Sequence, residues 1–324
     1  MNQPNRFDAI TNTIMQTIVL VYQVLAAVVF VVSLLSAYGW LKNPFIGGFF
    51  EQTMVLNESV TREPGQEWAL QEAGFRLGDQ LVSVASLPIS NASDLLAALE
   101  TLRVGQTVPV VMRLVDGEIR QANITLDALA PVDQLSYFVI PAFLSLVFLL
   151  ISLWIFGLRR TEPAGRAFSM LTTSMAIVIG GLFDLYTSHY FTYLWTMAVA
   201  LSGGALIMLA LVFPQEARVL FRAPYLRWLG FLIGIVLALN AYRVLYDYEN
   251  PTAYFDAWGN IYIFVGLAGL FYFGVMGYRA FFSLSLSSES GRVSTNRPSG
   301  RSFRSRWMLR PLGVYHLPVV ILSA

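Results

Sequence analysis

Few side chains in this sequence could carry chemistry, and their spacing argues against the usual membrane enzymes. The 324 residues contain no cysteine and two histidines, His189 and His316. Thiol nucleophiles and disulfides are therefore excluded, and neither histidine lies in the HExxH pattern of a zinc protease. Ser202 precedes two glycines but has no histidine in its own apolar segment, as a serine nucleophile would need. We therefore expect no catalytic residue, no metal site and no cofactor.

Four polar side chains near the ends of apolar segments are the remaining candidates for a site. They are Asp184 in one segment and Asn240, Arg243 and Asp247, which share one predicted helix face in another. Ionisable side chains within apolar spans are costly and often functional, and Arg243 and Asp247 could pair one helical turn apart. Two interpretations stay open. The four residues form an outer polar pocket, for a signal or for docking of a neighbouring domain, or they reach to the membrane surface without a further role.

Long apolar segments dominate the sequence and predict an α-helical polytopic membrane protein. Hydrophobic residues make up 56% of the chain and charged residues 13%, against about 25% charged residues in soluble domains. A membrane-spanning helix needs about 20 mostly apolar residues. Six segments meet this requirement, at 14–37, 135–158, 167–186, 193–213, 228–246 and 258–281. In the fifth, Gly230 and Gly234 lie four apart and favour close helix packing, within the chain rather than between two chains.

Arginines alternate between the predicted loops and orient the chain. The loop between the second and third spans, the loop between the fourth and fifth, and the segment after the sixth are arginine-rich, whereas the other two short loops contain no Arg or Lys. Because positive residues remain on the cytoplasmic side, residues 1–13 and the tail at 283–324 are predicted to be cytoplasmic, and residues 41–133 to lie outside. The Ser- and Arg-rich tail is predicted to be disordered near the lipid headgroups. The net charge of +1 gives no reason to expect nucleic acid as a partner.

Residues 41–133 interrupt the apolar segments and have the pattern of a small α+β domain, inserted before the five remaining helices at 134–282. Strands are predicted at 49–56, 81–84, 108–115 and 118–126. The last two flank Asp116-Gly117, a strong hairpin signal. Gly74 is the expected C-terminal cap of a short helix, and Asn91 is the expected start of a second one. Leu95 and Leu99 then share one face of that second helix.

The order of these elements resembles a bacterial PDZ domain of the protease-associated kind. The resemblance rests on residues 72–126, with the sequence AGFRLGDQLVSV, a capped leucine-rich helix and a strand pair around Asp-Gly. It implies a groove between the strand from Phe49 and the helix from Asn91, in which a peptide or a protein C-terminus would bind as an added strand. The loop at 45–49 departs from the Gly-Leu-Gly-Phe sequence usual in PDZ domains, so a flexible exit from the membrane stays open as its alternative interpretation. The implied peptide-binding residues are Phe45, Ile46, Gly47, Gly48, Phe49, Phe50, Leu95 and Leu99.

The layout of helix, external domain and helix bundle resembles the sensor region of bacterial membrane histidine kinases of the competence and quorum-sensing type. This resemblance implies a non-catalytic sensor that binds a peptide or protein outside and signals through the bundle. No phospho-acceptor histidine or ATP-binding motif follows, so it implies either a separate cytoplasmic kinase or effector, or a truncated kinase. The alternative is a membrane-anchored PDZ adaptor for an envelope protease or its substrates. Either protein is expected in the inner membrane of a bacterium.

Overall fold

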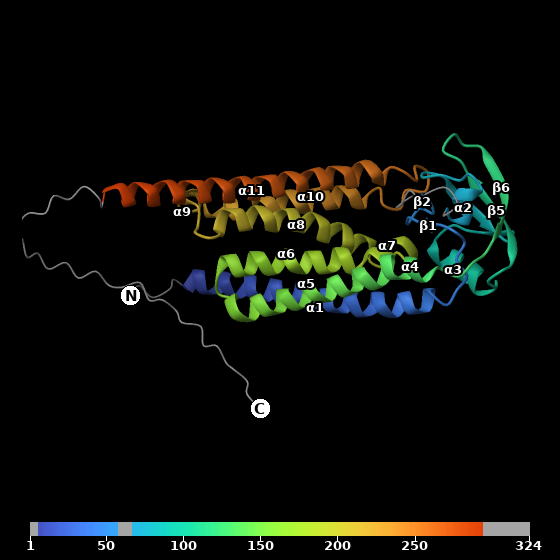
Figure 1. Ribbon diagram of the computed structural model, residues 1–324, viewed down its shortest axis with the longest axis horizontal. Coiled ribbons are helices and arrows are strands. Elements are labelled where there is room, and N and C mark those ends of the chain that lie inside the picture. Colours follow the sequence, from blue (N-terminus) through green and yellow to red (C-terminus); the bar gives the residue numbers. More distant parts are fainter. Residues whose placement is uncertain (1–5, 58–66, 294–324) are drawn as a thin grey trace, which may run out of the picture. The chain divides into compact units, whose positions relative to one another are not determined.

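Six helices in the described part of the chain are long and apolar enough to cross a membrane, which confirms the predicted multi-pass architecture (Figure 1). The computed structural model describes residues 6–57 and 67–293. The main helices are α1 (Arg6–Trp40), α5 (Ile140–Arg159), α6 (Pro163–Gly180), α8 (Thr192–Val212), α10 (Leu229–Tyr242) and α11 (Tyr254–Val293). Short helical segments extend or connect them, namely α4 (Pro131–Gln134), η1 (Leu135–Val139), α7 (Leu182–Thr187), α9 (Arg218–Arg222) and η2 (Pro224–Trp228).

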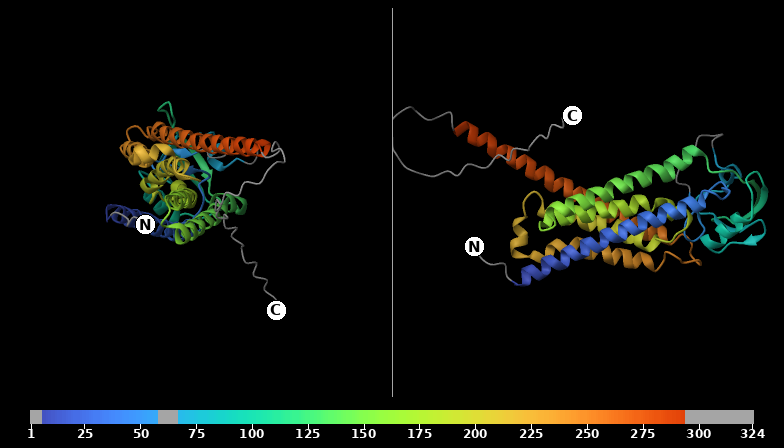
Figure 2. Two further views of the ribbon diagram at one scale, coloured as in Figure 1. Left: turned by 90° about the vertical axis from the view of Figure 1, so that its left-hand side faces the viewer. Right: turned by 90° about the horizontal axis from the view of Figure 1, so that it is seen from below.

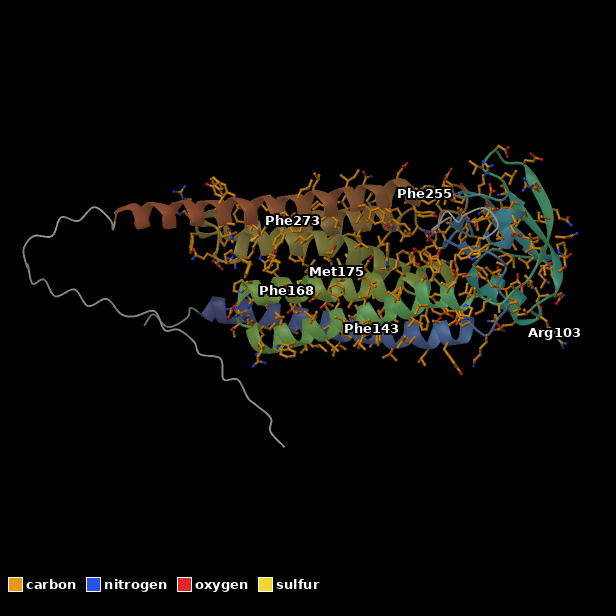
Figure 3. All side chains as sticks on the ribbon, in the orientation of Figure 1. Arg103, Phe143, Phe168, Met175, Phe255 and Phe273 are labelled. Atoms are coloured by element: carbon orange, nitrogen blue, oxygen red, sulfur yellow. The ribbon has the colours of Figure 1, made fainter. Side chains whose placement is uncertain are left out.

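Hydrogen bonds between small polar side chains join the first helices of the bundle. Helix α6 contacts α1, α5 and α8, and α8 also contacts α10. Gln23 of α1 donates its amide to the Ser152 hydroxyl of α5 at 2.8 Å, and Ser152 pairs with the Thr173 hydroxyl of α6 at 2.7 Å. In an apolar interior such bonds help to fix neighbouring helices. Large apolar side chains such as Phe143 and Phe273 lie instead on outward faces, with 64% and 70% exposure (Figure 3).

Two glycines on α10 allow it to approach α8 closely. A Cβ atom added at Gly230 would lie 3.1 Å from the Cα atom of Gly204, and one added at Gly234 would lie 2.7 Å from the carbonyl oxygen of Ala200. Side chains rarely tolerate contacts this tight, so the two helix backbones meet at these glycines. The predicted role of the glycine pair in packing within the chain is therefore confirmed.

Replacing Gly234 with alanine is expected to destabilise the bundle by about 1–3 kcal/mol, because the new methyl group meets backbone atoms that cannot move away independently. Thermal unfolding of the detergent-purified protein measures the effect. Gly266→Ala in α11 is the matched control, since no described atom lies within 4 Å of the Cβ position there. Equal unfolding midpoints for the two variants would contradict the close approach of α8 to α10.

The chain between α1 and α4 forms a small α+β domain beyond the end of α1 and next to α7 (Figures 1 and 2). We call residues 41–130 the inserted domain. Its four-stranded sheet is antiparallel and has the order β4-β3-β5-β6. Strand side chains such as Leu81, Val110 and Ile124 form its core together with Leu95 and Leu99. The elements are α2 (Ala69–Glu72), β3 (Gln80–Val84), β4 (Leu87–Pro88), α3 (Ala92–Glu100), β5 (Thr107–Arg113) and β6 (Ile119–Thr125).

Local sequence signals in the inserted domain are confirmed. Gly74 follows α2 with a φ of +83°, and Gly117 has a φ of +89° in the turn between β5 and β6. These left-handed conformations favour glycine, which lacks the Cβ atom that would clash. The Asn91 side chain accepts hydrogen bonds from the N–H groups of Ser93 at 2.9 Å and Asp94 at 3.1 Å, as an N-terminal cap does. The assignment of the domain as PDZ-like stays a prediction.

The predicted strand at 49–56 is corrected to two shorter strands. They are β1 (Phe49–Phe50) and β2 (Leu56–Asn57), which pair with each other. A tight turn separates them because the Glu51 N–H donates to the Val55 carbonyl at 2.8 Å, and Met54 takes a φ of +60°. The chain therefore reverses direction where the sequence pattern indicated continuous extension.

Two helix boundaries also differ from expectation. Helix α10 ends at Tyr242, whereas the fifth span was expected to reach residue 246. Helix α11 continues to Val293, past the expected start of the tail at 283, because no proline or glycine interrupts residues 278–290. The rest of the predicted tail, including His316, lies outside the described residues.

Candidate functional site

The inserted domain packs against the helices through a group of aromatic rings. The ring centroid of Phe49 lies 5.2 Å from the centroids of Trp68 and Tyr137 and 5.8 Å from that of Tyr186. Tyr137 belongs to η1 and Tyr186 to α7, so one side chain of the inserted domain contacts two separate helical segments. Aromatic pairs at such separations attract one another beyond the effect of buried area. We define the aromatic cluster as Trp40, Phe45, Phe49, Trp68, Tyr137, Phe183 and Tyr186.

Backbone hydrogen bonds anchor both ends of the inserted domain. The Phe45 N–H donates to the Asp127 carbonyl at 2.6 Å, and the Asp127 N–H donates to the Phe45 carbonyl at 3.1 Å. The Thr53 hydroxyl adds a contact to the loop between α10 and α11, where it donates to the Pro251 carbonyl at 2.8 Å. These contacts argue against the alternative interpretation of residues 45–49 as a flexible exit from the membrane.

The residues predicted to bind a peptide are all buried. Phe45 and Phe49 belong to the aromatic cluster, whereas the other large side chains of the set lie in the core of the inserted domain. Among the six members of the set that are not glycine, the most exposed side chain is that of Leu95, with 8% exposure. Gly47 is buried too, and a Cβ atom there would lie 2.8 Å from the Ala69 nitrogen. A ligand could therefore reach this set only after a rearrangement, and peptide binding there stays a prediction. The core members are Ile46, Phe50, Leu95 and Leu99, and Gly48 is buried beside them.

A loop of the bundle contacts the two elements that the resemblance implies for the groove. We call residues 188–190, between α7 and α8, the covering loop. Ser188 and Tyr190 share the lining of a small cavity of about 20 Å³ with Ser93 and Leu96 of α3. His189 lies against the backbone of Phe50 in β1. The covering loop therefore faces both sides of the predicted groove.

His189 and Asp184 hold the covering loop in a packed conformation. His189 has a φ of +58° and is 7% exposed. Neither ring nitrogen has a hydrogen-bond partner of normal geometry among the described residues, and burial lowers the pKa of His189 to about 3, against an opposing effect of the Phe50 backbone. The Asp184 carboxylate accepts hydrogen bonds from the N–H groups of Tyr190 at 3.1 Å and Phe191 at 2.9 Å. Asp184 therefore fixes the loop backbone.

The four residues of the predicted outer polar pocket are not brought together. Asp184 is buried, whereas Asn240 and Arg243 are exposed. Asp247 lies beyond the end of α10 and accepts hydrogen bonds from the N–H groups of Glu249 and Asn250, each at 3.1 Å. These bonds close a turn and hold the pKa of Asp247 below its usual range. In the part of the chain that the structure describes, no ion pair joins Arg243 to Asp247.

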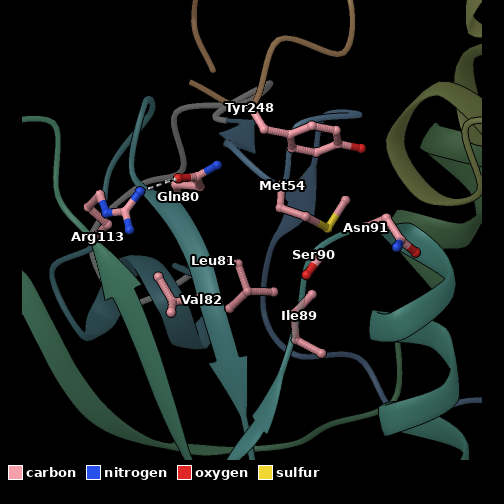
Figure 4. Close-up of a pocket in the computed structure, with 9 residues that line it drawn as sticks. All are labelled: Met54, Gln80, Leu81, Val82, Ile89, Ser90, Asn91, Arg113 and Tyr248. Atoms are coloured by element: carbon pink, nitrogen blue, oxygen red, sulfur yellow. Dashed lines mark hydrogen bonds between the residues drawn. The ribbon is translucent and has the colours of Figure 1, made fainter. Parts of the chain in front are cut away.

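An open pocket of about 350 Å³ lies at one end of the predicted groove (Figure 4). Met54, near the end of the β1–β2 turn, and Asn91, the cap of α3, both line it. Tyr248 covers it from the loop between α10 and α11, so the bundle supplies part of the lining. Arg113 donates to the Gln80 side-chain oxygen at 3.2 Å and places a positive charge at the rim. The remaining lining residues are Leu81, Val82, Ile89 and Ser90.

Several polar side chains are buried near this interface without a hydrogen-bond partner. An unpaired buried polar group costs about 1–3 kcal/mol. The arrangement of domain against bundle therefore contains unfavourable terms that the aromatic cluster must offset. The sequence offers one signal for this set, the polar run Glu51-Gln52-Thr53 after two phenylalanines, but it cannot show burial. At this interface the unpaired atoms are Glu51 Oε2, both amide atoms of Gln52, Tyr137 Oη, Tyr254 Oη and both ring nitrogens of His189.

In the described part of the inserted domain, Glu51 is the titratable group whose pKa this packing shifts most. It is 4% exposed, and one of its oxygens accepts a hydrogen bond from the Asn57 side chain. Tyr186 of α7 and Tyr254 of α11 lie close enough to interact electrostatically with its carboxyl group. Burial raises the pKa of Glu51 to about 8. The charge of this carboxyl group therefore changes near neutral pH.

Comparisons with known proteins add no family to this description. No model of a known protein family matches the chain, and no curated protein matches it. Among the described residues, no three His, Asp or Glu side chains group in a way that could hold a metal ion.

Proposed function

We propose that the chain is a non-catalytic membrane sensor whose inserted domain binds an extended peptide or a protein segment outside the cell. The principal support is the position of the covering loop and Tyr248. Both belong to the helix bundle, and both lie against the part of the inserted domain where the sequence implies a peptide groove. A ligand that reaches the buried residues of the predicted groove must displace bundle residues. Binding and a change in the bundle are then one event.

The energetics of the interface favour a switch between two arrangements. A ligand shifts such an equilibrium by its difference in affinity for the two states. The buried, unpaired polar groups at Glu51, His189 and Tyr254 would recover hydrogen bonds when the interface opens, whereas the aromatic cluster would lose contacts. These terms oppose each other, and a peptide that binds the open arrangement more tightly would raise the population of that arrangement.

The open pocket suggests the chemistry of the ligand. Leu81 and Ile89 offer apolar contact, and Arg113 offers a guanidinium group at the rim. An extended segment that adds to a strand edge presents alternate side chains to such a pocket. We therefore propose a peptide with an apolar side chain and a neighbouring acidic group or free carboxylate. A separate cytoplasmic kinase or effector at the arginine-rich end of the bundle completes the proposal.

The absence of cysteine from the chain allows a direct test. We expect Ser90→Cys, carrying a photo-crosslinker in the pocket, to capture a small secreted peptide in living cells. Ser86→Cys is the matched control, because it places the same label on an exposed serine of the same domain outside the pocket. Capture of an envelope protease or a folded envelope protein would instead support the alternative, a membrane-anchored adaptor. Equal capture by both variants, or capture by neither, would contradict ligand binding in the pocket.

A further inference from the structure

An apolar cavity of about 540 Å³ opens between α1, α6, α8 and α10, away from the inserted domain. Ile18 and Leu25 of α1 form one wall, and Phe231 and Ile235 of α10 form the opposite wall. Ile18 and Ile235 are 46% and 37% exposed, so the cavity opens on the outer surface of the helices. In a bilayer such a surface faces the hydrocarbon chains of lipids.

A buried arginine lies at one end of this cavity. Arg166 is 5% exposed and lines the cavity. Its guanidinium group donates to the carbonyls of Arg160 and Thr161, each at 3.1 Å, and to the Asn12 side-chain oxygen at 3.3 Å. All three acceptors are neutral, and no carboxylate pairs with Arg166 among residues 12–57 and 67–281, the ranges whose side chains the structure describes. A buried charge is normally paired with an opposite one, because its desolvation is costly.

A second arginine, next to the lining residue Trp228, adds positive charge near Arg166. Arg227 of η2 lies close enough to Arg166 for the two charges to repel each other. Its Nε atom donates to the Pro224 carbonyl at 3.0 Å, again a neutral acceptor. No ion pair joins either guanidinium group to a carboxylate among the residues whose side chains the structure describes, and guanidinium groups bind phosphate well.

The length of the cavity matches one leaflet of a membrane. Its wall on α1 runs from Met15 to Leu25, which at 1.5 Å per residue is about 15 Å. This is half of the hydrocarbon thickness of about 30 Å. The two arginines lie at the end that the arginine-rich loops mark as cytoplasmic. Basic pockets between helices on that side suit anionic lipid headgroups.

We infer that this cavity binds an anionic phospholipid, with the phosphate between Arg166 and Arg227 and one acyl chain against α1 and α10. The inference is independent of the proposed peptide sensor. The bundle would then contain a site whose occupancy depends on the amount of anionic lipid in the surrounding membrane.

Native mass spectrometry of the full chain in detergent tests the inference. Phosphatidylglycerol and phosphatidylcholine with identical acyl chains serve as probes. We expect the unmodified protein to retain phosphatidylglycerol about tenfold better, and expect Arg227→Gln and Ile235→Trp each to reduce this preference about fivefold or more. Arg227→Gln removes one charge, and Ile235→Trp fills the cavity without changing charge.

Two control variants separate the site from general effects. Arg222→Gln removes an exposed arginine that, unlike Arg227, has no electrostatic interaction with Arg166, and Leu232→Trp adds the same ring to an exposed position on the same helix. Both should keep the preference. Arg166→Gln is an additional variant, but it also loses the bonds to Arg160 and Thr161, so Arg227→Gln and Ile235→Trp decide the outcome if it does not fold.

Three outcomes would overturn the inference. They are equal retention of the two phospholipids, an unchanged preference in both deciding variants, and retention of palmitate or inorganic phosphate in place of phosphatidylglycerol. Palmitate and inorganic phosphate are included because either anion could bind to the two arginines in place of a phospholipid.

Discussion

Replacing Phe49 with alanine is expected to weaken the interface between the inserted domain and the helix bundle by about 3–5 kcal/mol. The side chain is 1% exposed and contacts rings from α1, η1 and α7. It belongs to the aromatic cluster, whereas its neighbour Phe50 belongs to the core of the inserted domain. The variant should therefore separate the two parts while leaving the fold of each intact.

Hydrogen exchange followed by mass spectrometry measures this effect. Faster exchange is expected at residues 45–56 and in the covering loop, with little change in β5 and β6. Phe143→Ala is the matched control, since it removes the same ring from an outward face of the bundle that is 64% exposed. Uniformly faster exchange through the whole inserted domain would show that Phe49 supports the domain fold itself, and the interface would lose its assigned role.

Replacing Glu51 with glutamine is expected to stabilise the same interface by roughly 3 kcal/mol at pH 7. The packed arrangement raises the pKa of Glu51 from 4.5 to about 8. The protonated carboxyl group is therefore favoured when the interface is closed, and its contribution is complete below pH 4.5 and lost as the pH rises to 8. Glutamine is neutral throughout this range, so the variant should lack that loss.

His189 produces the opposite dependence at lower pH. Its pKa falls from 6.5 to about 3 in the packed arrangement, so closure is favoured above pH 6.5 and weakens as the pH falls toward 3. Labelling of a Ser188→Cys thiol at a series of pH values reports opening of the covering loop once each rate is divided by that of the denatured chain at the same pH, because thiolate formation alone accelerates labelling as the pH rises. This ratio should rise from pH 6.5 to 8 in the parent chain, where His189 is already neutral, and Glu51→Gln should abolish the rise. Glu118→Gln, which removes an exposed carboxylate, should behave like the parent chain, and a similar effect of both variants would refute the role of Glu51.

The sequence was sufficient for features that depend on neighbouring residues. Uninterrupted apolar runs predicted six spans because a bilayer requires a minimum helix length. Gly74, Asn91 and Gly117 marked turns and caps because their conformations or side-chain bonds are local. Gly230 and Gly234 indicated close packing because only small residues allow helix backbones to meet.

Features that depend on residues far apart in the sequence could not be predicted from such local signals. The pattern at 49–56 resembles one strand, yet Glu51, Gln52 and Thr53 turn the chain so that Phe49 can meet rings from the bundle. Asp247 was placed on a helix by spacing, but its carboxylate instead caps the following turn. The burial of Glu51 and His189 depends on contacts between segments more than 100 residues apart along the chain.

The paired ends of the inserted domain have a consequence for the history of such proteins. Phe45 and Asp127 form an antiparallel bridge, so their Cα atoms lie only about 5 Å apart. A domain whose entry and exit coincide can be gained, lost or exchanged without altering the path of the helices on either side. The same helix bundle can therefore carry different inserted domains. Replacement of the whole domain would change the binding specificity, while the surface of the bundle that contacts the domain, around Tyr137 and Phe183, would stay the same.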